Sequence, residues 1–489
     1  MIEKAPAGWQ LELLGNLVMK MSNGANVKQH DESVGYPISR IETIWNGNID
    51  SQRVKYIKEN DSDFVNKYKL KEGDILFSHI NSDSHIGKTA IYRGQPEVLI
   101  HGINLLLIRF SDEYCQDFFN YQFKYLKEKG AFSAVAQRAV NQSSINQHKL
   151  KSFPFIYPNL EEQKRIVVKI EELFSELDSG IASLKTAQEQ LKIYRQALLK
   201  HAFEGKLTEQ WRKDNADKLE TPEQLLARIQ TERETRYQQQ LEEWKQAVKD
   251  WEEKGKEGKK PTKPALPKSS DLHANDAYQR IGGLPASWAW LKLSDLLQNS
   301  PQNGLYKPSS FYGLGCQIIR IDNFYDGKVT DKQSLKRLAV TDNEKDTYGL
   351  KLGDLIVNRV NSIEYLGKSA LIRKLDEPIV FESNIMRCTL LSKTIEREFI
   401  VLYLNTIIGR KELCKNAKHA VNQASINQTD VGNSFLPICS LAEQQEIVNL
   451  LEEKLPIIEQ NEKEIEDALT KAELLRQSIL KKAFSGQLS

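Results

Sequence analysis

The stretch AVNQSSINQ at residues 139–147 decides the fold, because it returns almost unchanged as AVNQASINQ at residues 420–428. The distance between the two copies is the size of a domain rather than of a solenoid repeat. We therefore expect one architecture that is built twice within a single chain.

Other short stretches repeat at nearly the same spacing. LKEGDI at 70–75 matches LKLGDL at 350–355, and KHAFEGKL at 200–207 matches KKAFSGQL at 481–488. The register between the halves hardly drifts, since Pro6 matches Pro285 near the start and Leu207 matches Leu488 near the end. Such a small drift predicts a tandem duplication in which the second half repeats the order of the first.

The composition fits globular domains combined with long exposed helices. Of the 489 residues 40% are hydrophobic and 27% are charged, and the net charge is only +2, so an anion-binding surface must arise from local placement. The five cysteines lack metal-ligand spacing and do not repeat between the halves, which disfavours a zinc site or disulfide framework and suggests a reducing cytosol. No apolar run is long enough for a signal peptide or a membrane span.

Residues 1–158 and 285–438 are predicted to be mixed α/β domains of one design, because short β-rich runs bounded by turn residues precede a helix in each. The strands expected in the first are Tyr36–Ile41, Asp74–Phe77, Thr89–Tyr92, Val98–Ile100 and Leu105–Phe110, followed by a helix at Tyr114–Lys129. Those expected in the second are Gln317–Ile321, Asp354–Val357, Ser369–Ile372, Ile379–Phe381 and Met386–Leu391, followed by a helix from Glu396 to about Lys415.

Each domain leads into a long helical region, at residues 159–206 and 439–489, with apolar residues at steps of three and four. Such a stripe needs a partner, and the nearest candidate is the stripe of the other helix. Gly180 and Pro456 are expected to bend or interrupt their helices. The matching seam positions are Leu184, Ala187, Leu191, Tyr194 and Leu198 in the first helix, and Ile465, Ala468, Ala472, Leu475 and Ile479 in the second.

Residues 207–284 are predicted to be a spacer between the halves. Thr221 and Pro222 have the composition of a helix start, and a Lys-, Gly- and Pro-rich stretch follows at 255–270. The apolar stripe of this helix is expected to pack against the long helices or a partner. Its members are Tyr237, Leu241, Trp244, Val248 and Trp251.

We expect the two long helices to pair antiparallel, which would place one α/β domain at each end of a helical pair. Parallel pairing stays open, because an insert of about 75 residues at ~3.3 Å per residue can return along the helices. The helix within the spacer shortens its reach and favours the antiparallel arrangement. Two similar heads held apart by a rigid spacer suit duplex DNA, which repeats its geometry every ~34 Å, and they predict a split recognition site.

The whole chain resembles the specificity (S) subunit of type I restriction–modification systems. The resemblance rests on the order domain, long helix, spacer, domain, long helix. It rests also on the domain entries PAGW at 6–9 and PASW at 285–288, on the Gly-Asp strand starts and Ile-Asn-Gln segments, and on the helix openings LEEQ at 160–163 and LAEQ at 441–444. The expected fold class is α+β, with two tandem-duplicated α/β target-recognition domains separated by a pair of long antiparallel coiled-coil helices with pseudo-two-fold symmetry.

The resemblance implies DNA recognition without catalysis. Each target-recognition domain is expected to bind one half of a bipartite site in double-stranded DNA, while the helices set the spacing and dock two modification (methyltransferase) subunits. S-adenosylmethionine is then held by the modification subunits, and ATP and Mg by the restriction subunits of the full complex, while this chain binds no cofactor directly. The expected location is the cytoplasm of a bacterium or archaeon, in a system of phage defence.

The segments GKT at 87–89 and GKS at 367–369 look like the end of a phosphate-binding loop. The glycine that such a loop needs five residues earlier is Ser82 in the first copy and Ser362 in the second, so the motif fails twice. A turn that leads into a strand is the simpler interpretation, and a phosphate contact from Lys88 and Lys368 is the alternative.

Residues shared by both halves cannot tell two different half-sites apart. Asn141 and Asn422 lie in the repeated stretch, so structural hydrogen bonding or generic phosphate contact is favoured over base reading. Specificity is expected where the halves diverge within the shared frame, at 77–86 against 357–366, 23–35 against 303–315, and 45–48 against 324–328. Exchange of residues 77–87 or 304–314 should therefore change the recognised sequence and leave assembly intact.

Amide side chains suit adenine and basic ones suit guanine, with a solvated loop as the competing interpretation at each position. No catalytic or metal-binding residue is expected. The residues expected at the DNA are Asn46, Asn48, His79, Asn81, Lys88, Asn141, Lys307, Tyr325, Arg359, Asn361, Lys368 and Asn422.

Other functions compete with this one. An adenine methyltransferase needs an Asn/Asp-Pro-Pro-Tyr/Phe motif, and the chain contains no Asn-Pro or Asp-Pro dipeptide. Nor does it contain a Gly-rich cofactor loop after a strand, or an HExxH or GxSxG motif. The alternatives that stay open are a recognition subunit of another multi-subunit methylation or phage-defence system, and a coiled-coil scaffold that binds no DNA.

Overall fold

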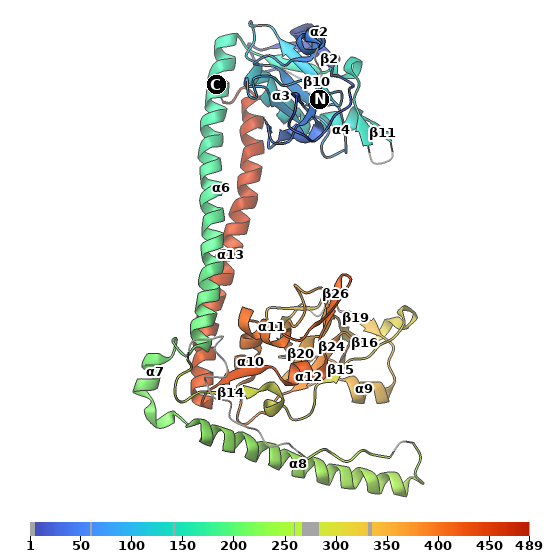
Figure 1. The fold of residues 1–489 in the computed structure, drawn as a ribbon, viewed down its shortest axis with the longest axis vertical. Helices are drawn as coiled ribbons and strands as arrows, with labels where there is room; N and C mark the ends of the chain where they lie inside the picture. Colours follow the sequence, from blue (N-terminus) through green and yellow to red (C-terminus); the bar gives the residue numbers. More distant parts are fainter. Residues whose placement is uncertain are drawn as a thin grey trace. The chain divides into compact units, whose positions relative to one another are not determined.

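The structure is a computed structural model that describes residues 5–58, 61–139, 142–258, 260–266, 283–330 and 335–488. The chain divides into two compact units (Figure 1). Unit 1 comprises Met1–Gln188 together with Lys463–Ser489, and unit 2 comprises Glu189–Glu462. Each unit therefore contains one α/β domain and a portion of each long helix.

A four-stranded antiparallel sheet forms the centre of unit 1. Its order is β2 (Val18–Asn23), β10 (Leu105–Phe110), β7 (Ile75–Ser78) and β9 (Thr89–Ile91). Alternate residues of β7 point to opposite faces, so Ile75 and Phe77 meet α3 (Gln116–Glu128) in one core cluster. Leu76 belongs to a second cluster, which explains why the strand is apolar throughout.

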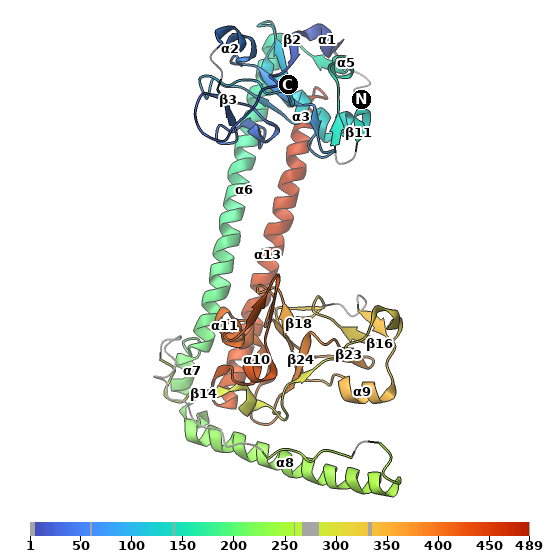
Figure 2. The same ribbon diagram turned by 45° about the vertical axis from the view of Figure 1, so that its right-hand side comes forward.

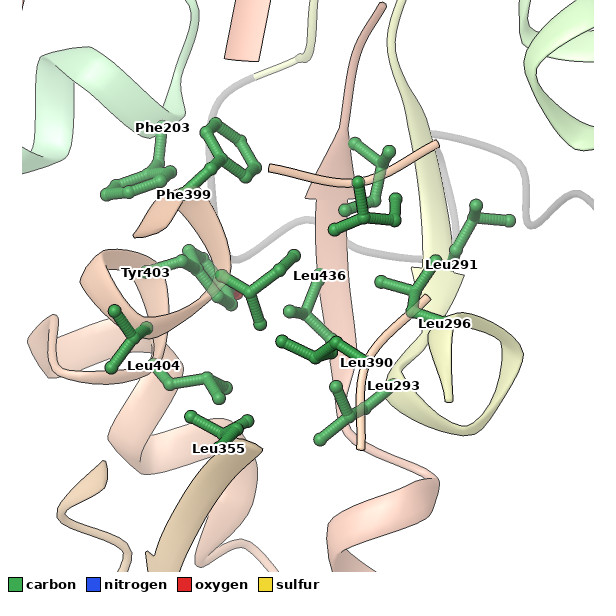
Figure 3. Packing of buried hydrophobic residues seen from close by; sticks show 14 of the residues in the cluster. Phe203, Leu291, Leu293, Leu296, Leu355, Leu390, Phe399, Tyr403, Leu404 and Leu436 are labelled. Atoms are coloured by element: carbon green, nitrogen blue, oxygen red, sulfur yellow. The ribbon is translucent and has the colours of Figure 1, made fainter. Parts of the chain in front are cut away.

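Unit 2 repeats this sheet with β15 (Gln302–Asn303), β24 (Ile385–Thr389), β20 (Asp354–Asn358) and β22 (Ser369–Leu371). Its main core gathers side chains from the sheet, from α10 (Arg397–Leu404) and from the end of the first long helix (Figure 3). Phe203 lies against Phe399 and Tyr403 there, with ring centroids 5.1 and 5.3 Å away.

The first and last strands of each domain pair with each other. β1 (Gln10–Leu13) is antiparallel to β13 (Pro154–Tyr157), and β14 (Ala289–Lys292) is antiparallel to β27 (Phe435–Ile438). This pairing brings the entry and the exit of each domain together, directly before a long helix begins.

Most predicted strands are present, with ends that differ by at most five residues, but two predictions are wrong. Val98–Ile100 forms no strand and makes only isolated bridges through Ile100 to Ile38 and Lys69. The single helix expected from Glu396 is two helices, α10 and α11 (Ile407–Leu413). The chain breaks between them because Thr406 caps α11, its hydroxyl accepting from the Gly409 amide at 3.0 Å.

The long helices are α6 (Leu160–Phe203, 44 residues) and α13 (Leu441–Ala483, 43 residues). Both continue past Gly180 and Pro456, so the expected interruptions are absent. In unit 1 the first part of α6 packs against the last part of α13, and in unit 2 the last part of α6 packs against the first part of α13. The pairing is therefore antiparallel within each unit (Figures 1 and 2).

Ion pairs join the two long helices in both units. Asp178 of α6 pairs with Arg476 of α13 in unit 1, and Arg195 of α6 pairs with Glu459 of α13 in unit 2. Asp178 and Glu459 occupy equivalent positions of the duplication, and so do Arg195 and Arg476. The duplication thus extends to reciprocal contacts between the helices, as pseudo-two-fold symmetry requires.

The predicted seam is wrong at one position in each helix. It includes Tyr194 and Leu475, yet both are 52% exposed. The neighbouring arginines, Arg195 and Arg476, reach across instead and make the ion pairs. A strict three-four spacing drifts around a straight helix, so a stripe drawn from sequence alone misplaces such positions.

The repeated helix openings hold each domain onto its helix. The Trp9 indole donates to Glu162 at 3.1 Å, and the Trp288 indole donates to Glu443 at 3.0 Å. The next residue of α13, Gln444, accepts from the Glu396 amide and donates to the Cys439 carbonyl, and Gln163 does the equivalent in unit 1. The repeated motifs PxxW and LxEQ therefore have a structural role: they attach each α/β domain to the start of its long helix. We call this contact the tryptophan joint.

The spacer begins with α7 (Glu209–Asp214) and continues as α8 (Pro222–Glu253), which Thr221 caps as predicted. Leu225 and Ile229 of α8 enter the core of unit 2. Two members of the predicted stripe, Trp244 and Trp251, contact the spacer itself. Their indoles donate to carbonyls of the following spacer, Trp244 to Pro261 at 3.0 Å and Trp251 to Gly258 at 3.3 Å. None of the described helices is long and apolar enough to cross a membrane.

Candidate nucleic-acid interface

In each unit a divergent stretch and the shared stretch lie in one small three-stranded sheet. The divergent stretches are 77–86 and 357–366, and the shared ones are 139–147 and 420–428. In unit 1, β8 (Ile80–Asn81) pairs with β12 (Gln142–Ser144), which pairs with β11 (Gln137–Ala139). In unit 2, β21 (Val360–Asn361) pairs with β26 (Gln423–Ser425), which pairs with β25 (Lys418–Ala420). A strand from a divergent stretch thus lies beside a hairpin from the shared stretch.

The shared hairpin of unit 2 is open to solvent over its whole outer part. All residues from Lys418 to Gln423 are exposed, and Val421 at the tip is 91% exposed. Asn422 beside it adopts a left-handed backbone conformation, with φ of 64°. Its counterpart Asn141 lies outside the described residues.

A second convergence occurs at a tight hairpin in each domain. β4 (Ile44–Trp45) and β5 (Asn48–Ile49) are joined by Asn46-Gly47, and β17 (Phe324–Tyr325) and β18 (Lys328–Val329) are joined by Asp326-Gly327. All four loop residues have positive φ, between 46° and 80°, which is the type I′ turn that Asn-Gly and Asp-Gly favour.

Lys88 joins the first of these hairpins. Together with Asn46 and Asn48 it lines a half-open cavity of about 630 Å³ within unit 1. Burial and the nearby charge of Lys127 lower the pKa of Lys88 below its ordinary value. Three residues predicted from separate stretches are therefore neighbours.

Lys368 joins the second hairpin, in a different environment. Its ammonium lies 3.8 Å from the ring centre of Tyr325 and 5.0 Å from that of Phe324. Tyr365 also approaches at 5.6 Å, and the lysine is only 5% exposed. Burial lowers the pKa of Lys368 to about 8.

Several predicted residues are engaged in internal contacts. Asn81 and Asn361 each accept from the next backbone amide, from Ser82 at 2.9 Å and from Ser362 at 2.8 Å. These equivalent bonds give both asparagines the same structural role of shaping the following turn. A contact to DNA from either residue stays a prediction.

The remaining predicted residues are also partly or wholly occupied. Arg359 donates to the Ser383 carbonyl at 3.0 Å, and Lys307 pairs with Glu344 at 2.9 Å. His79 is buried, and burial lowers its pKa to about 4, so its ring is neutral at physiological pH. These environments favour supporting roles over direct base contact for Lys307 and His79.

Sequence reasoning missed Lys124 and Lys127, which also line the cavity in unit 1. They lie three residues apart on α3 and therefore share a face of the helix. That spacing was visible in the sequence, but only the fold places α3 beside the Asn46-Gly47 turn.

The family relationship follows from comparison with known proteins. A model of the type I restriction modification DNA specificity domain matches residues 6–192 and 292–471, which is most of the chain and one match in each half. The chain belongs to this family. As a type I specificity protein it provides DNA sequence recognition for a restriction–modification system, and its two recognition domains are arranged in tandem.

Individual relatives agree. The specificity subunit of type I restriction enzyme EcoKI from Escherichia coli K12 is 24% identical over 99% of this specificity protein and 90% of its own length. That of StySPI from Salmonella potsdam is 27% identical over the same shares. A putative MjaX specificity subunit from Methanocaldococcus jannaschii is 40% identical over 203 residues, which are 41% of this chain and 47% of that one.

Solved structures have the same fold. A chain from work on complex assembly and conformational transition of the type I R-M system aligns over 99% of both chains, with a TM-score of 0.66 and 17% identity. The crystal structure of the HsdS subunit from Thermoanaerobacter tengcongensis aligns over 99% of both chains, with a TM-score of 0.50 and 17% identity.

Proposed function

We propose that each unit reads one half of a bipartite DNA site and that this chain performs no chemistry itself. The duplicated frame that carries divergent surface segments is the observation that supports this proposal. Because both units have the same fold, their recognition surfaces are built from equivalent elements. The side chains on those elements differ between the units, so each unit can read a different half-sequence.

In this proposal the DNA-facing surface of each unit includes the three-stranded sheet and the tight hairpin. Asn46, Asn48 and Lys88 serve in unit 1, while Tyr325, Arg359 and Asn422 serve in unit 2. The pairing of long helices then sets the number of unread base pairs between the half-sites. Methyl transfer with S-adenosylmethionine, and ATP- and Mg-dependent cleavage, belong to the modification and restriction subunits of a cytoplasmic complex.

A duplicated apolar patch supports docking of two modification subunits. Ile193 and Tyr194 are 65% and 52% exposed on the part of α6 in unit 2. Leu474 and Leu475, the equivalent positions of the duplication, are 59% and 52% exposed on the part of α13 in unit 1. Equivalent exposed patches on equivalent helix segments favour two copies of one partner.

The docking proposal is tested by Ile193→Lys and Leu474→Lys, separately and together. Each single substitution should reduce the number of bound modification subunits from two to one, and the double substitution should remove both, as measured by native mass spectrometry. Lys192→Gln, at an exposed neighbouring position, is the matched control. Full binding of two subunits by the double variant would contradict the docking surface.

The recognition proposal is tested by exchanging a surface segment. Residues 80–85 are suitable, because Ser78 and His79 before them and Ile86 and Gly87 after them are buried and should be retained. A chain that carries this segment from a relative of different specificity should direct methylation to a motif in which one half alone has changed. Loss of assembly with an unchanged motif would refute the assignment.

A further inference from the structure

A cavity of unit 1 lies beside the Asn46-Gly47 turn. It lies where the turn, the face of α3 and the paired ends of α6 and α13 meet, and all its lining residues belong to unit 1. Its cationic side chains are Lys88, Lys124, Lys127 and Arg476. Its volume of about 630 Å³ and half-open mouth allow a charged group from outside to enter.

Lys124 is built into the wall of this cavity. Its ammonium donates to the Gly47 carbonyl at 3.4 Å and lies 5.1 Å from the ring centre of Tyr121. A side chain at Gly47 would place its Cβ only 3.0 Å from the lysine nitrogen. Burial lowers the pKa of Lys124 to about 8, so the protein holds a partly desolvated cation at this position.

Lys88 and Lys127 make no direct ion pair within the described part of the chain, although Glu128 lies close enough for the charge of Lys127 to oppose the rise that burial causes in its pKa. The two lysines are close enough for the charge of Lys127 to lower the pKa of Lys88. Among the three carboxylates of the lining, Asp178 is engaged by Arg476. Three lysines therefore face two remaining carboxylates, Glu128 and Glu171.

The equivalent place in unit 2 has different side chains and different contacts. Lys328 occupies the hairpin position that corresponds to Asn48, and it pairs with Glu459 of α13 at 3.2 Å. Lys368 is covered by aromatic rings. The positions of the second half that correspond to Lys124 and Lys127 are Asn405 and Ile408, neither of which is basic. The cation near Lys368 is Arg410, whose guanidinium donates to the carbonyls of Glu364 and Leu366.

We propose that Lys88, Lys124 and Lys127 bind a phosphate of the DNA backbone at the half-site of unit 1, and that unit 2 lacks this anchor. This inference rests on the proposed function. A phosphodiester group supplies the missing anion, and the ammonium groups and the asparagine amides of Asn46 and Asn48 are suitable donors for its oxygens. Unit 1 then contributes more to salt-dependent affinity than its counterpart.

The test measures how duplex binding by the complex with modification subunits depends on salt. Lys88→Gln with Lys127→Gln should reduce the slope of log K against log salt by about one, because one phosphate contact is lost. Lys127→Gln alone, at a half-exposed helix position, should fold normally and show part of the effect. Lys129→Gln is the control, since Lys129 is exposed on the same turn and lies outside the cavity.

The outcomes separate this site from the general function. A wild-type complex that ignores duplex sequence would overturn the proposed function and this site with it. Sequence-specific binding with a slope that the substitutions leave unchanged would overturn the phosphate site alone. Two further results would also overturn it: binding of inorganic phosphate by the wild type with an unchanged DNA slope, which assigns the cavity to a free anion, or loss of modification subunits from the variant, which assigns it to a protein contact.

Discussion

The two units have the same internal joints and different surfaces. Trp9 with Glu162 repeats as Trp288 with Glu443, and the ion pair of Asp178 with Arg476 repeats as that of Glu459 with Arg195. Around the tight hairpin, by contrast, unit 1 has an open cationic cavity and unit 2 has a lysine covered by aromatic rings. The duplication therefore preserved the contacts that position each domain, whereas the surface around the tight hairpin diverged.

The repeated tryptophan joint differs in burial, which gives the largest expected effect on stability. Glu443 is fully buried and also accepts from Thr208 at 2.7 Å and Arg212 at 2.6 Å, whereas Glu162 is partly exposed. Glu443→Gln leaves Arg212 without its charged partner and should cost about 3 kcal/mol of unfolding free energy. The matched Glu162→Gln should cost about 1 kcal/mol or less. Equal losses in denaturant unfolding would show that the two joints are equivalent.

Acid should weaken unit 1 more than unit 2. Burial lowers the pKa values of His79 and His101 to about 4, while the corresponding positions of unit 2 are Arg359 and Phe381. In the unfolded chain these histidines bind a proton as the pH falls below about 6.5, whereas in the folded domain they stay neutral down to about pH 4. The free energy of unfolding is therefore unaffected above pH 6.5 and decreases as the pH falls from 6.5 to 4.

The substitution His101→Phe copies unit 2 and should flatten this pH dependence. At pH 4 the variant should keep on the order of 2–3 kcal/mol of unfolding free energy that the wild type loses through His101. Hydrogen exchange at pH 7 and pH 5 can follow the two units separately, with peptides from β10 and β24 as reporters. Equal acid sensitivity of both sheets in the wild type would contradict the proposed difference.

The paired helices should show the smallest difference. Arg195 reaches both Glu459 and Glu462, whereas Arg476 reaches Asp178 alone and stacks 4.7 Å from the ring centre of Phe174. Arg195→Ala should lower the free energy of unfolding by about 1 kcal/mol, and Arg476→Ala should lower it by about 0.5 kcal/mol. Both losses should be smaller at high salt, because salt screens the ion pairs. Thermal unfolding at two salt concentrations measures this, and a larger cost for Arg476→Ala would reverse the ranking.

The duplication and the order of domains could be predicted from repeated stretches, and the long helices from their periodicity. The antiparallel pairing was favoured over the parallel one because the helix in the spacer shortens its reach. The repeated stretches were informative because they contain residues such as Trp9, Glu162 and Gln163, which make hydrogen bonds between a domain and its long helix. The same residue types make the same bonds in the second unit. Tyr194 was misplaced because the period of a helix stripe is not exact over several turns.

The site was predicted only in part. Asn46, Asn48 and Lys88 were predicted from separate stretches and line one cavity in the structure, while their contact with DNA stays a prediction. Lys124 was missed because its distance from Gly47 depends on how α3 packs, which no motif records. The burial of His79 and the engagement of Lys307 are likewise tertiary facts that a loop sequence does not reveal.

The division of reading between the two units is best tested in cells that contain the partner subunits. Genome-wide mapping of methylated adenine should compare the wild-type chain with a chain whose residues 304–314 in unit 2 come from a relative of different specificity. We predict an interrupted motif for the wild type, and for the variant a motif that keeps one half and changes the other. A continuous motif, or a change in both halves at once, would contradict the reading of one half-site by each unit.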